Sequence, residues 1–334
     1  MTRNRTRIQI NGAFGSGRSM VMSKLRDALF ALLFCMSLGL AGVSSAQVNF
    51  LVPAYANPCC VDGPAAWSQL IAFAGNSPNV GVHVIFNPAS GPGLATDPNF
   101  VDGLGNGPLV DLREAGGVTY GYVATTFGAR PSAEVLADID LYYDALYVGL
   151  LDGVFFDEMS TDLADVGYYA ALRDYVKTKD ASARVIGNPG VSGVVNPSGQ
   201  VAFGVTDYAM SMDTIVTFEN FGTEYATNYV APSWVDDFTS DHFAHIVHTQ
   251  PTWDTSLVAL AASRNAGFLF VTDDVLPNPF DRLGVYTAAE VADLVTFNAV
   301  QSVPALGGGG LAILAGLLAG VGAWRARPSS RLKV

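Results

Sequence analysis

The chain has 334 residues, half of them hydrophobic, and its 30 acidic and 18 basic side chains give a net charge of −12. Ten of the basic residues but only one of the acids lie before residue 47 or after residue 303, so the segment between carries 8 basic and 29 acidic side chains. Such an acidic surface repels nucleic acid and anionic membranes. We therefore expect neither as a partner, whereas a cationic polymer would be attracted.

The first 46 residues have the composition of a signal peptide. Residues 22–46 begin with two basic side chains, continue with an apolar run and end in small residues, where a signal peptidase would cut after Ala46. We predict Gln47 as the first residue of the mature chain. We interpret the first residues as an N-terminal over-extension, with Met20 or Met22 as the true initiator. The sequence thus predicts an exported bacterial protein.

Eight apolar runs rich in Val, Ile, Phe and Tyr follow along the segment 47–302. The predicted strands are 49–55, 80–87, 118–125, 153–158, 183–188, 213–219, 242–249 and 267–274. The clearest predicted helices are 132–146, 162–178, 255–266 and 287–300, with Ser132 and Thr287 in capping positions. Strands that alternate with helices form a parallel sheet, and eight such units predict a single (β/α)8 barrel of the TIM type, an α/β fold. A doubly wound open sheet is the alternative.

Cysteine and histidine spacing gives no metal site. Cys35 belongs to the predicted signal peptide, and Cys59 and Cys60 are neighbours. A disulfide between neighbours needs unusual backbone geometry, so we expect none. The run HFAHIVH (242–248) contains three histidines, but a strand sends His245 to the opposite face from the other two. We expect no metal and no cofactor.

Nearly every predicted strand ends in a polar side chain. The carboxyl ends of the strands in a (β/α)8 barrel meet at one rim, where the chemistry lies. The residues at these ends are Tyr55, Asn87, Thr125, Asp157, Glu158, Asn188, Glu219, His248, Thr249, Asp273 and Asp274. Together they predict a polar cleft suited to a hydroxyl-rich or amide-bearing ligand.

Asp157 and Glu158 directly follow the apolar run 154–156. Neighbouring strand residues point to opposite faces, so both acids cannot face the barrel interior from a regular strand. At least one of them must take its position from the turn that follows. Adjacent carboxylates also resist joint ionisation, which raises the pKa of one of them.

Residues 303–334 have the pattern of a membrane-anchored tail. About 20 apolar, Gly-rich residues precede Trp324 and four basic side chains, a length sufficient to span a bilayer. The pattern is similar to bacterial C-terminal sorting signals of the PEP and IPTL type, although the motif at 303–306, VPAL, departs from both. We expect a membrane or sorting tail, and a buried core helix is the alternative.

Six motifs between residues 51 and 283 resemble the spherulin-4 family. They are FNPASGPG (86–93), YGYVATTFGAR (120–130), DGVFFDE (152–158), GNPG (187–190), TFENF (217–221) and GFLFVTDD (267–274) followed by NPFDRL, in the order that the family has them. The family is similar to glycoside hydrolase family 135, whose fungal enzymes cleave galactosaminogalactan, an α-linked polymer of galactosamine and N-acetylgalactosamine. The resemblance implies an endo-acting glycoside hydrolase, secreted or surface-anchored, that acts on such a polysaccharide in a matrix or biofilm.

The resemblance also implies catalytic roles for Asp157, Glu158 and Glu219. Glycoside hydrolysis needs one acid to protonate the leaving oxygen and a second group across the sugar. We expect Glu158 to be the general acid/base, with Asp157 holding either Glu158 or the sugar's 2-substituent. Glu219 would stand opposite as nucleophile or base.

Structural roles for the same acids are the alternative. Glu219 could cap the following helix, and Asp157 could form an ion pair with Arg130 or Arg184. The protein would then be a non-catalytic carbohydrate-binding or structural protein of the cell surface.

We expect the protein to be a monomer. The sequence also indicates weaker candidates for contacts with the substrate. These candidates are Tyr55, Asn87, Ser90, Tyr122, Asn188, His248, Asp273 and Asp274.

Overall fold

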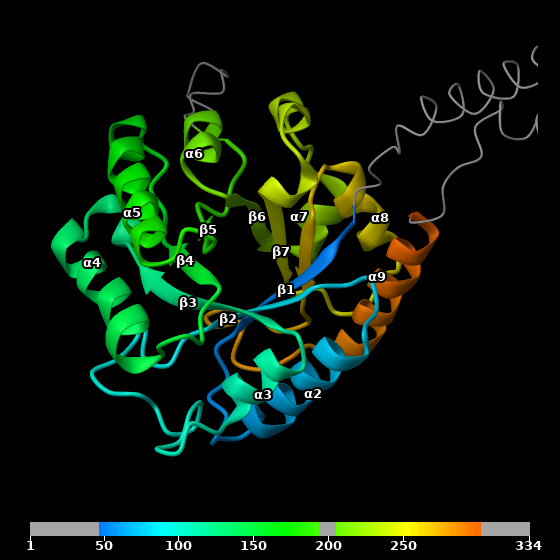
Figure 1. Ribbon diagram of the computed structural model, residues 1–334. Coiled ribbons are helices and arrows are strands. Elements are labelled where there is room, and N and C mark those ends of the chain that lie inside the picture. Colours follow the sequence, from blue (N-terminus) through cyan, green and yellow to red (C-terminus); the bar gives the residue numbers. More distant parts are fainter. Residues whose placement is uncertain (1–46, 194–204, 302–334) are drawn as a thin grey trace, which may run out of the picture. The chain divides into compact units, whose positions relative to one another are not determined.

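Eight parallel strands form a closed barrel in chain order, and the last strand pairs with the first (Figure 1). The computed structural model describes residues 47–193 and 205–301. The strands are β1 (Asn49–Ala54), β2 (Val82–Phe86), β3 (Val118–Ala124), β4 (Gly153–Asp157), β5 (Arg184–Gly187), β6 (Thr214–Phe221), β7 (Phe243–His248) and β8 (Phe268–Val271). The predicted (β/α)8 barrel is confirmed, and the alternative of an open sheet is wrong.

Helices lie between successive strands and surround the barrel. They are α2 (Gly63–Asn76), α3 (Pro108–Glu114), α4 (Ser132–Asp140), α5 (Val166–Lys179), α6 (Val205–Ser211), α7 (Gly222–Thr227), α8 (Ser256–Ser263) and α9 (Thr287–Gln301). Short helical segments are η1 (Thr126–Gly128), η2 (Leu141–Leu146), η3 (Leu163–Asp165), η4 (Ser233–Asp237) and η5 (Ser240–His242). Figure 1 shows α4 and α5 on one side of the strands and α9 on the other.

Alternate residues of each strand face the barrel interior and the helices. Tyr120 of β3 and His83 of β2 stack inside the barrel, with 2.9 Å between the hydroxyl and the ring nitrogen Nδ1. On the outer face of β2, Phe86 packs against Tyr142 and Tyr147. Aromatic residues thus fill both the barrel interior and the space between the strands and the helices. The strands are therefore buried on both sides, as their nearly continuous apolar sequences predict.

The predicted helix 132–146 is only partly α-helical. It is α4 up to Asp140 and continues as the π-helical segment η2. Tyr142 of this segment is fully buried, and its hydroxyl donates to the backbone carbonyl of Tyr122 at 2.9 Å. A π turn inserts an extra residue into a helix, and here it carries an anchor for β3.

Ser132 and Thr287, the two predicted capping residues, do not act as N-caps, because each is already the first residue of its helix. Ser132 is the first residue of α4, whose N-cap is Pro131. Thr287 is the first residue of α9, and its hydroxyl donates to a carbonyl of the preceding turn. Glu290, in the first turn of α9, is fully buried and accepts from the backbone N–H of Val271 at 2.9 Å. The acid therefore fixes the end of β8 and does not serve the helix terminus.

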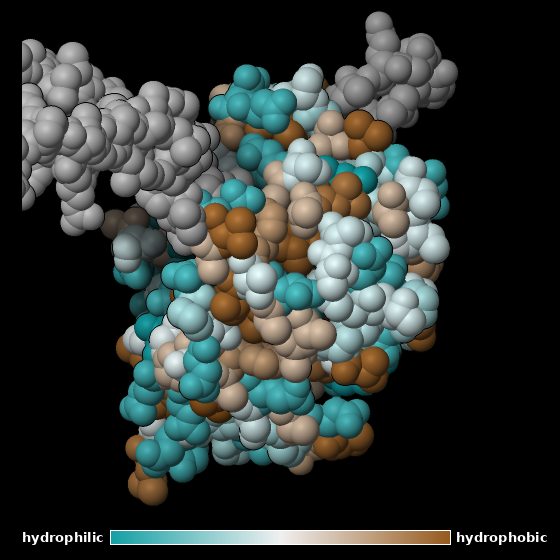
Figure 2. Space-filling view, turned by 90° about the vertical axis from the view of Figure 1, so that its right-hand side faces the viewer, coloured by the Kyte–Doolittle hydropathy of each residue, from teal (hydrophilic) through white to brown (hydrophobic). Residues whose placement is uncertain are grey.

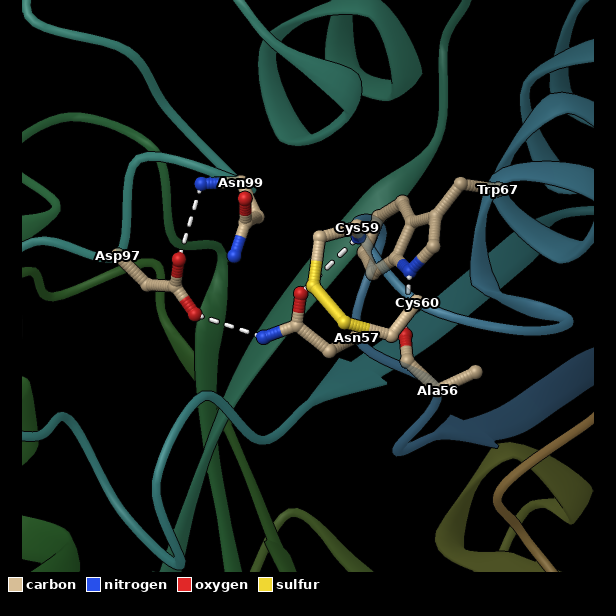
Figure 3. The surroundings of a disulfide bond; sticks show 7 residues. All are labelled: Ala56, Asn57, Cys59, Cys60, Trp67, Asp97 and Asn99. Carbon is tan, nitrogen blue, oxygen red and sulfur yellow. Dashed lines mark hydrogen bonds between the residues drawn. A yellow bond between two sulfur atoms is a disulfide. The ribbon is translucent and has the colours of Figure 1, made fainter.

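The expectation of no disulfide is wrong, because Cys59 and Cys60 are bonded to each other (Figure 3). Both cysteines are exposed in the loop between β1 and α2. Asn57 folds this loop sharply: its side-chain oxygen accepts from the backbone N–H of Cys59, and its carbonyl accepts from that of Cys60, both at 3.1 Å. The expectation took into account the unusual backbone geometry that bonded neighbouring cysteines need, but not a turn that supplies this geometry.

No helix within residues 47–193 and 205–301 is long and apolar enough to cross a membrane. The predicted signal peptide and C-terminal tail lie outside these ranges. Figure 2 views the side on which α9 lies and shows hydrophilic residues interspersed with hydrophobic ones. This surface agrees with helices that bury one face against the barrel, such as α9 with Val291 and Leu294.

Candidate active site

The turn after β4 separates the side chains of Asp157 and Glu158. Asp157 is the last residue of the strand, whereas Glu158 has a φ of 50°, in the left-handed region. The hydroxyl oxygen of Thr125 lies 2.8 Å from the carbonyl oxygen of Asp157 and 2.9 Å from that of Glu158. A non-glycine residue rarely adopts positive φ and needs such support. The prediction that the turn positions one of the two acids is confirmed.

A β-bulge in β6 aims Glu219 into the barrel. Two consecutive residues of β7 pair with residues 216 and 218 of β6, so Thr217 is an extra residue. Phe218 consequently faces outward, with its ring 4.8 Å from that of Tyr225 in α7. Strict alternation from the start of the strand would instead turn Glu219 outward. Bulges commonly re-aim side chains beside active sites in this way.

Asn188 joins the acids of two strands. Its side-chain nitrogen donates to Oδ1 of Asp157 at 2.7 Å and to Oε2 of Glu219 at 2.6 Å. Only 7% of Asn188 is exposed, and its Oδ1 has no hydrogen-bond partner among the residues that the structure describes. The amide therefore holds two acceptors together and presents a buried acceptor of its own.

The loop after β5 holds both Asn188 and Glu219. The backbone N–H of Glu219 donates to the carbonyl of Gly190 at 2.9 Å, and Val191 forms an antiparallel bridge with Phe218. Gly190 has a φ of 69°, and a Cβ there would lie 3.5 Å from that of Glu219. The sequence contained this segment as the GNPG motif but gave no signal that it would pair with β6.

Burial first, and then the negative charge of Asp157, raise the pKa of Glu219 to about 7, against the lowering effect of the hydrogen bond from Asn188. Glu219 can therefore both give and take a proton near neutral pH, the property required of a general acid/base. The negative charge that adds to this shift lies on Asp157 of β4, whereas Glu219 belongs to β6.

Tyr55 and Tyr122 line the same site. Their rings meet edge to face with centroids 5.4 Å apart, and Phe280 packs on Tyr55 at 5.5 Å. Burial and then the charge of Asp157 raise the pKa of both tyrosine hydroxyls. Both hydroxyls are thus protonated at neutral pH, and the structure brings them together with the acids as the sequence predicted.

The negative charge of Glu158 is one of the smaller causes of the raised pKa of Tyr122, after burial and Asp157. This effect indicates that Glu158 lies near Tyr122. Its carboxylate has neither a hydrogen bond nor an ion pair within the described part of the chain. Glu158 is therefore near the site but outside the cluster that Asn188 joins.

Asn87 and Ser90 belong to a turn after β2. The side-chain oxygen of Asn87 accepts from the backbone N–H of Gly91 at 3.0 Å, and Ser90 is exposed with a φ of 55°. Asn87 thus shapes the loop. Neither side chain contacts the acids in the described structure, and their predicted contacts with the substrate stay predictions.

Other predicted contacts are engaged with protein groups. Arg282 binds Asp273 at 3.0 Å and Asp274 at 3.2 Å. His248 is buried, its Nδ1 lies 3.0 Å from the hydroxyl of Thr249, and burial lowers its pKa. A role in binding the substrate stays a prediction for all three.

Neither the cap nor the ion pairs considered as structural alternatives for these acids are formed in the described part of the chain. Arg130 pairs with Asp138 at 2.7 Å and Arg184 with Asp241 at 3.0 Å, so neither arginine holds Asp157. The N-cap of α7 is Phe221, without a side-chain cap from Glu219. Within the described ranges, no group of three or more His, Cys, Asp or Glu is placed to hold a metal ion.

The fold and this site define a TIM-barrel protein with a carboxylate cluster at the carboxyl ends of its strands. The family model described as Spherulation-specific family 4 matches residues 49–294. The chain belongs to this family, as its motifs predicted.

Two relatives extend this result. Spherulin-4 of Physarum polycephalum is 32% identical over 199 residues, which are 59% of this chain and 51% of that protein. The chain thus spans about half the length of this curated relative. The crystal structure of Aspergillus clavatus Sph3 in complex with GalNAc has a TM-score of 0.58 at 24% identity and covers 75% of this chain and 98% of Sph3. This similarity supports the fold.

Proposed function

We propose that the protein is a glycoside hydrolase that cleaves an amino-sugar-containing polysaccharide. One observation carries the proposal: Asn188 joins the carboxylates of Asp157 and Glu219 at the rim of the barrel, where TIM-barrel enzymes place their chemistry. Membership of the Spherulation-specific family 4 supports it.

The distances favour Asp157, and not Glu158, as the partner of Glu219. The hydrogen bonds of 2.7 and 2.6 Å to one nitrogen bound the separation of the two carboxylate oxygens at about 5.3 Å. Retaining glycosidases hold their carboxyl groups about 5 to 5.5 Å apart, and inverting enzymes about 6.5 to 9.5 Å. A separation of at most about 5.3 Å between these carboxylate oxygens favours retention of configuration at the sugar.

In the proposed mechanism Glu219 acts first as the acid. It gives its proton to the glycosidic oxygen as the bond from that oxygen to the sugar carbon breaks, while Asp157 attacks the same carbon and forms an ester. Glu219, now ionised, then takes a proton from water, whose oxygen attacks the sugar carbon and releases Asp157. A pKa of about 7 suits Glu219 to both steps.

A galactosaminogalactan-like, α-linked polymer is the proposed substrate. The GalNAc bound to the structurally similar Sph3 supports a sugar of this kind. The Oδ1 of Asn188, which has no hydrogen-bond partner in the described part of the chain, is an acceptor for a hydroxyl or amide N–H of the substrate. The acidic surface would attract a partly deacetylated polymer, which carries ammonium groups.

We further propose that the protein is exported and works at the cell surface as a monomer, in endo mode and without a cofactor. The sequences of residues 1–46 and 303–334 support the location.

The test is release of new reducing ends from a panel of amino-sugar polymers by wild-type protein and by Glu219→Gln and Asp157→Asn. We expect each substitution to lower turnover by roughly 10²-fold or more. The matched control is Glu134→Gln, the same chemical change on a side chain of α4 that is 63% exposed.

Normal turnover in Glu219→Gln would overturn the mechanism. Binding of a polymer by the wild type without any release of reducing ends would instead favour a non-catalytic carbohydrate-binding protein.

A further inference from the structure

The disulfide of Cys59 and Cys60 has little to contribute to the stability of the fold. Disulfides stabilise mainly by closing a loop in the unfolded chain, and the effect falls with the length of that loop. Two neighbours close the shortest loop possible. Both side chains are also exposed, so they add nothing to the core.

The loop that carries the disulfide is nevertheless held firmly. The side chain of Asn57 accepts from Cys59 and donates to Asp97 at 2.7 Å, which ties the loop after β1 to the loop after β2 (Figure 3). Asp97 in turn accepts from the backbone N–H of Asn99 at 2.9 Å. Its own backbone N–H donates to the hydroxyl of Tyr147, a fully buried residue. The hydrogen bonds Cys59–Asn57, Asn57–Asp97 and Asp97–Tyr147 thus anchor an exposed tip to the core.

The backbone on both sides of the disulfide is shaped for this tip. Val61 is 96% exposed and has a φ of 44°, a conformation that a β-branched residue rarely adopts. A Cβ on Gly63 would lie 1.8 Å from the carbonyl oxygen of Asn57, so only glycine lets α2 begin directly beneath the turn. The chain therefore presents two sulfurs and an apolar side chain to the outside.

This tip lies on the side of the barrel that carries the candidate active site. It follows Tyr55, whose ring contacts Tyr122, one of the residues that line the carboxylate cluster. The backbone N–H of Tyr55 donates to the carbonyl of Phe280 at 3.0 Å, so the loop after β8 is also close. The disulfide therefore lies on a loop at the carboxyl ends of the strands, on the same side of the barrel as the carboxylate cluster.

We propose that the Cys59–Cys60 disulfide, with Val61, is an accessory sugar-binding subsite for the polysaccharide chain beyond the carboxylate cluster. A ring closed by two neighbouring cysteines presents polarisable sulfur and CH groups without a strong hydrogen-bond donor. The C–H face of a pyranose ring packs on such a surface as it does on an aromatic side chain. Reduction opens the ring, gives two thiols that can rotate apart and removes the subsite.

The proposal rests on the proposed function for the identity of the ligand, and its test uses two independent readouts. Binding to soluble polymer is measured by affinity gel electrophoresis, and hydrolysis is measured on oligosaccharides of increasing length. The proteins are the wild type, Cys59→Ser/Cys60→Ser, Val61→Ser and the control Val148→Ser. Val148 is 62% exposed and lies before β4, at the opposite end of the barrel.

We expect the double cysteine variant to bind polymer about five- to tenfold more weakly than the wild type, with a smaller loss for Val61→Ser and none for Val148→Ser. Hydrolysis of the longest substrates should show the same loss, while the shortest substrates that are cleaved should be unaffected. Treatment of the wild type with a phosphine should reproduce the effect. The phosphine takes up oxygen from water and each sulfur gains a proton, and the phosphine should leave the double variant unchanged.

Equal binding by the wild type and the double variant overturns the subsite, even if the enzyme is active. An equal loss on short and long substrates, or a thermal midpoint lowered by more than about 5 °C, assigns the disulfide a structural role and also overturns it. Binding that depends on the disulfide in a protein that releases no reducing ends supports the subsite and refutes the hydrolase.

Discussion

Asn188 and Glu219 are joined by a hydrogen bond of 2.6 Å, although Asn188 follows β5 and Glu219 lies in β6, 31 positions later. The same amide nitrogen donates to Asp157, so three consecutive strands meet at one side chain. Asn188 stabilises the ionised form of Glu219, while burial and Asp157 oppose it. The balance of these effects sets the proton affinity of the proposed catalytic acid.

Asn188→Ala should shift the pH dependence of activity. The hydrogen bond from Asn188 lowers the pKa of Glu219, so its removal should raise that pKa. If protonated Glu219 is the acid, activity falls as pH rises through its pKa, and the alkaline limb of the profile should move to higher pH. The measurement is kcat/KM from pH 4 to 9. An unchanged limb with reduced activity would show that Asn188 only contacts the substrate.

Glu219→Gln should change how stability depends on pH. The pKa of Glu219 is 4.5 in a model compound and about 7 in the folded protein. The folded state favours protonated Glu219, so this carboxyl stabilises the fold fully below pH 4.5. As pH rises from 4.5 through 7, the free energy of unfolding falls by on the order of 2 to 3 kcal/mol. Glu219→Gln lacks this loss, so its stability relative to the wild type should increase from pH 4.5 to 8. Urea unfolding at several pH values tests this, and parallel profiles would contradict it.

Deletion of Thr217 should leave Glu219 facing the barrel interior. The deletion removes the bulge, and strict alternation from Val216 then again places Phe218 outward and Glu219 inward. Activity should therefore stay above that of Glu219→Gln, and combining the deletion with Glu219→Gln should lower it further. Far-UV circular dichroism checks that the barrel remains. Activity of the deletion variant no higher than that of Glu219→Gln would contradict the prediction and show that Glu219 needs the bulge itself.

His83 and His245 should make the protein sensitive to acid. Burial is the main cause that lowers the pKa of His83 to about 4 and that of His245 to about 3. Because these values lie below the 6.5 of an unfolded chain, the contribution of each neutral histidine is full above pH 6.5 and is lost as pH falls toward 4 and 3.

Glu219 contributes with the opposite sign between pH 7 and 4.5, so the histidine effect is best measured in the Glu219→Gln background. There, His83→Gln should flatten the decrease in the urea midpoint from pH 6.5 to 4. The same slope with and without His83 would contradict the prediction.

The sequence predicted the barrel because its signals are local and repeated. The apolar run at 153–158 and its polar end were visible in the chain, and the structure ends β4 at Asp157. Alternation alone indicated that Asp157 and Glu158 could not both face inward, and the positive φ of Glu158 agrees. The capping positions were less reliable, because Pro131 and not Ser132 precedes α4.

Other features depended on contacts that no local pattern contains. Asn57 sets the turn that lets Cys59 and Cys60 bond, and the rule against neighbouring cysteines did not include it. The sequence paired Glu158 with Glu219, whereas the distances link Asp157 with Glu219 through Asn188.

The sequence by itself determined the eight strands, their parallel order and the set of acids and amides at their carboxyl ends, because hydrophobic periodicity is a property of the chain. Only the tertiary structure decided which acids meet. The bulge at Thr217 sets the direction of Glu219, and neighbouring strands bring it to Asn188. Its raised pKa follows from burial and from the charge of Asp157, a residue 62 positions earlier in the chain. Burial and distance exist only once the barrel has closed.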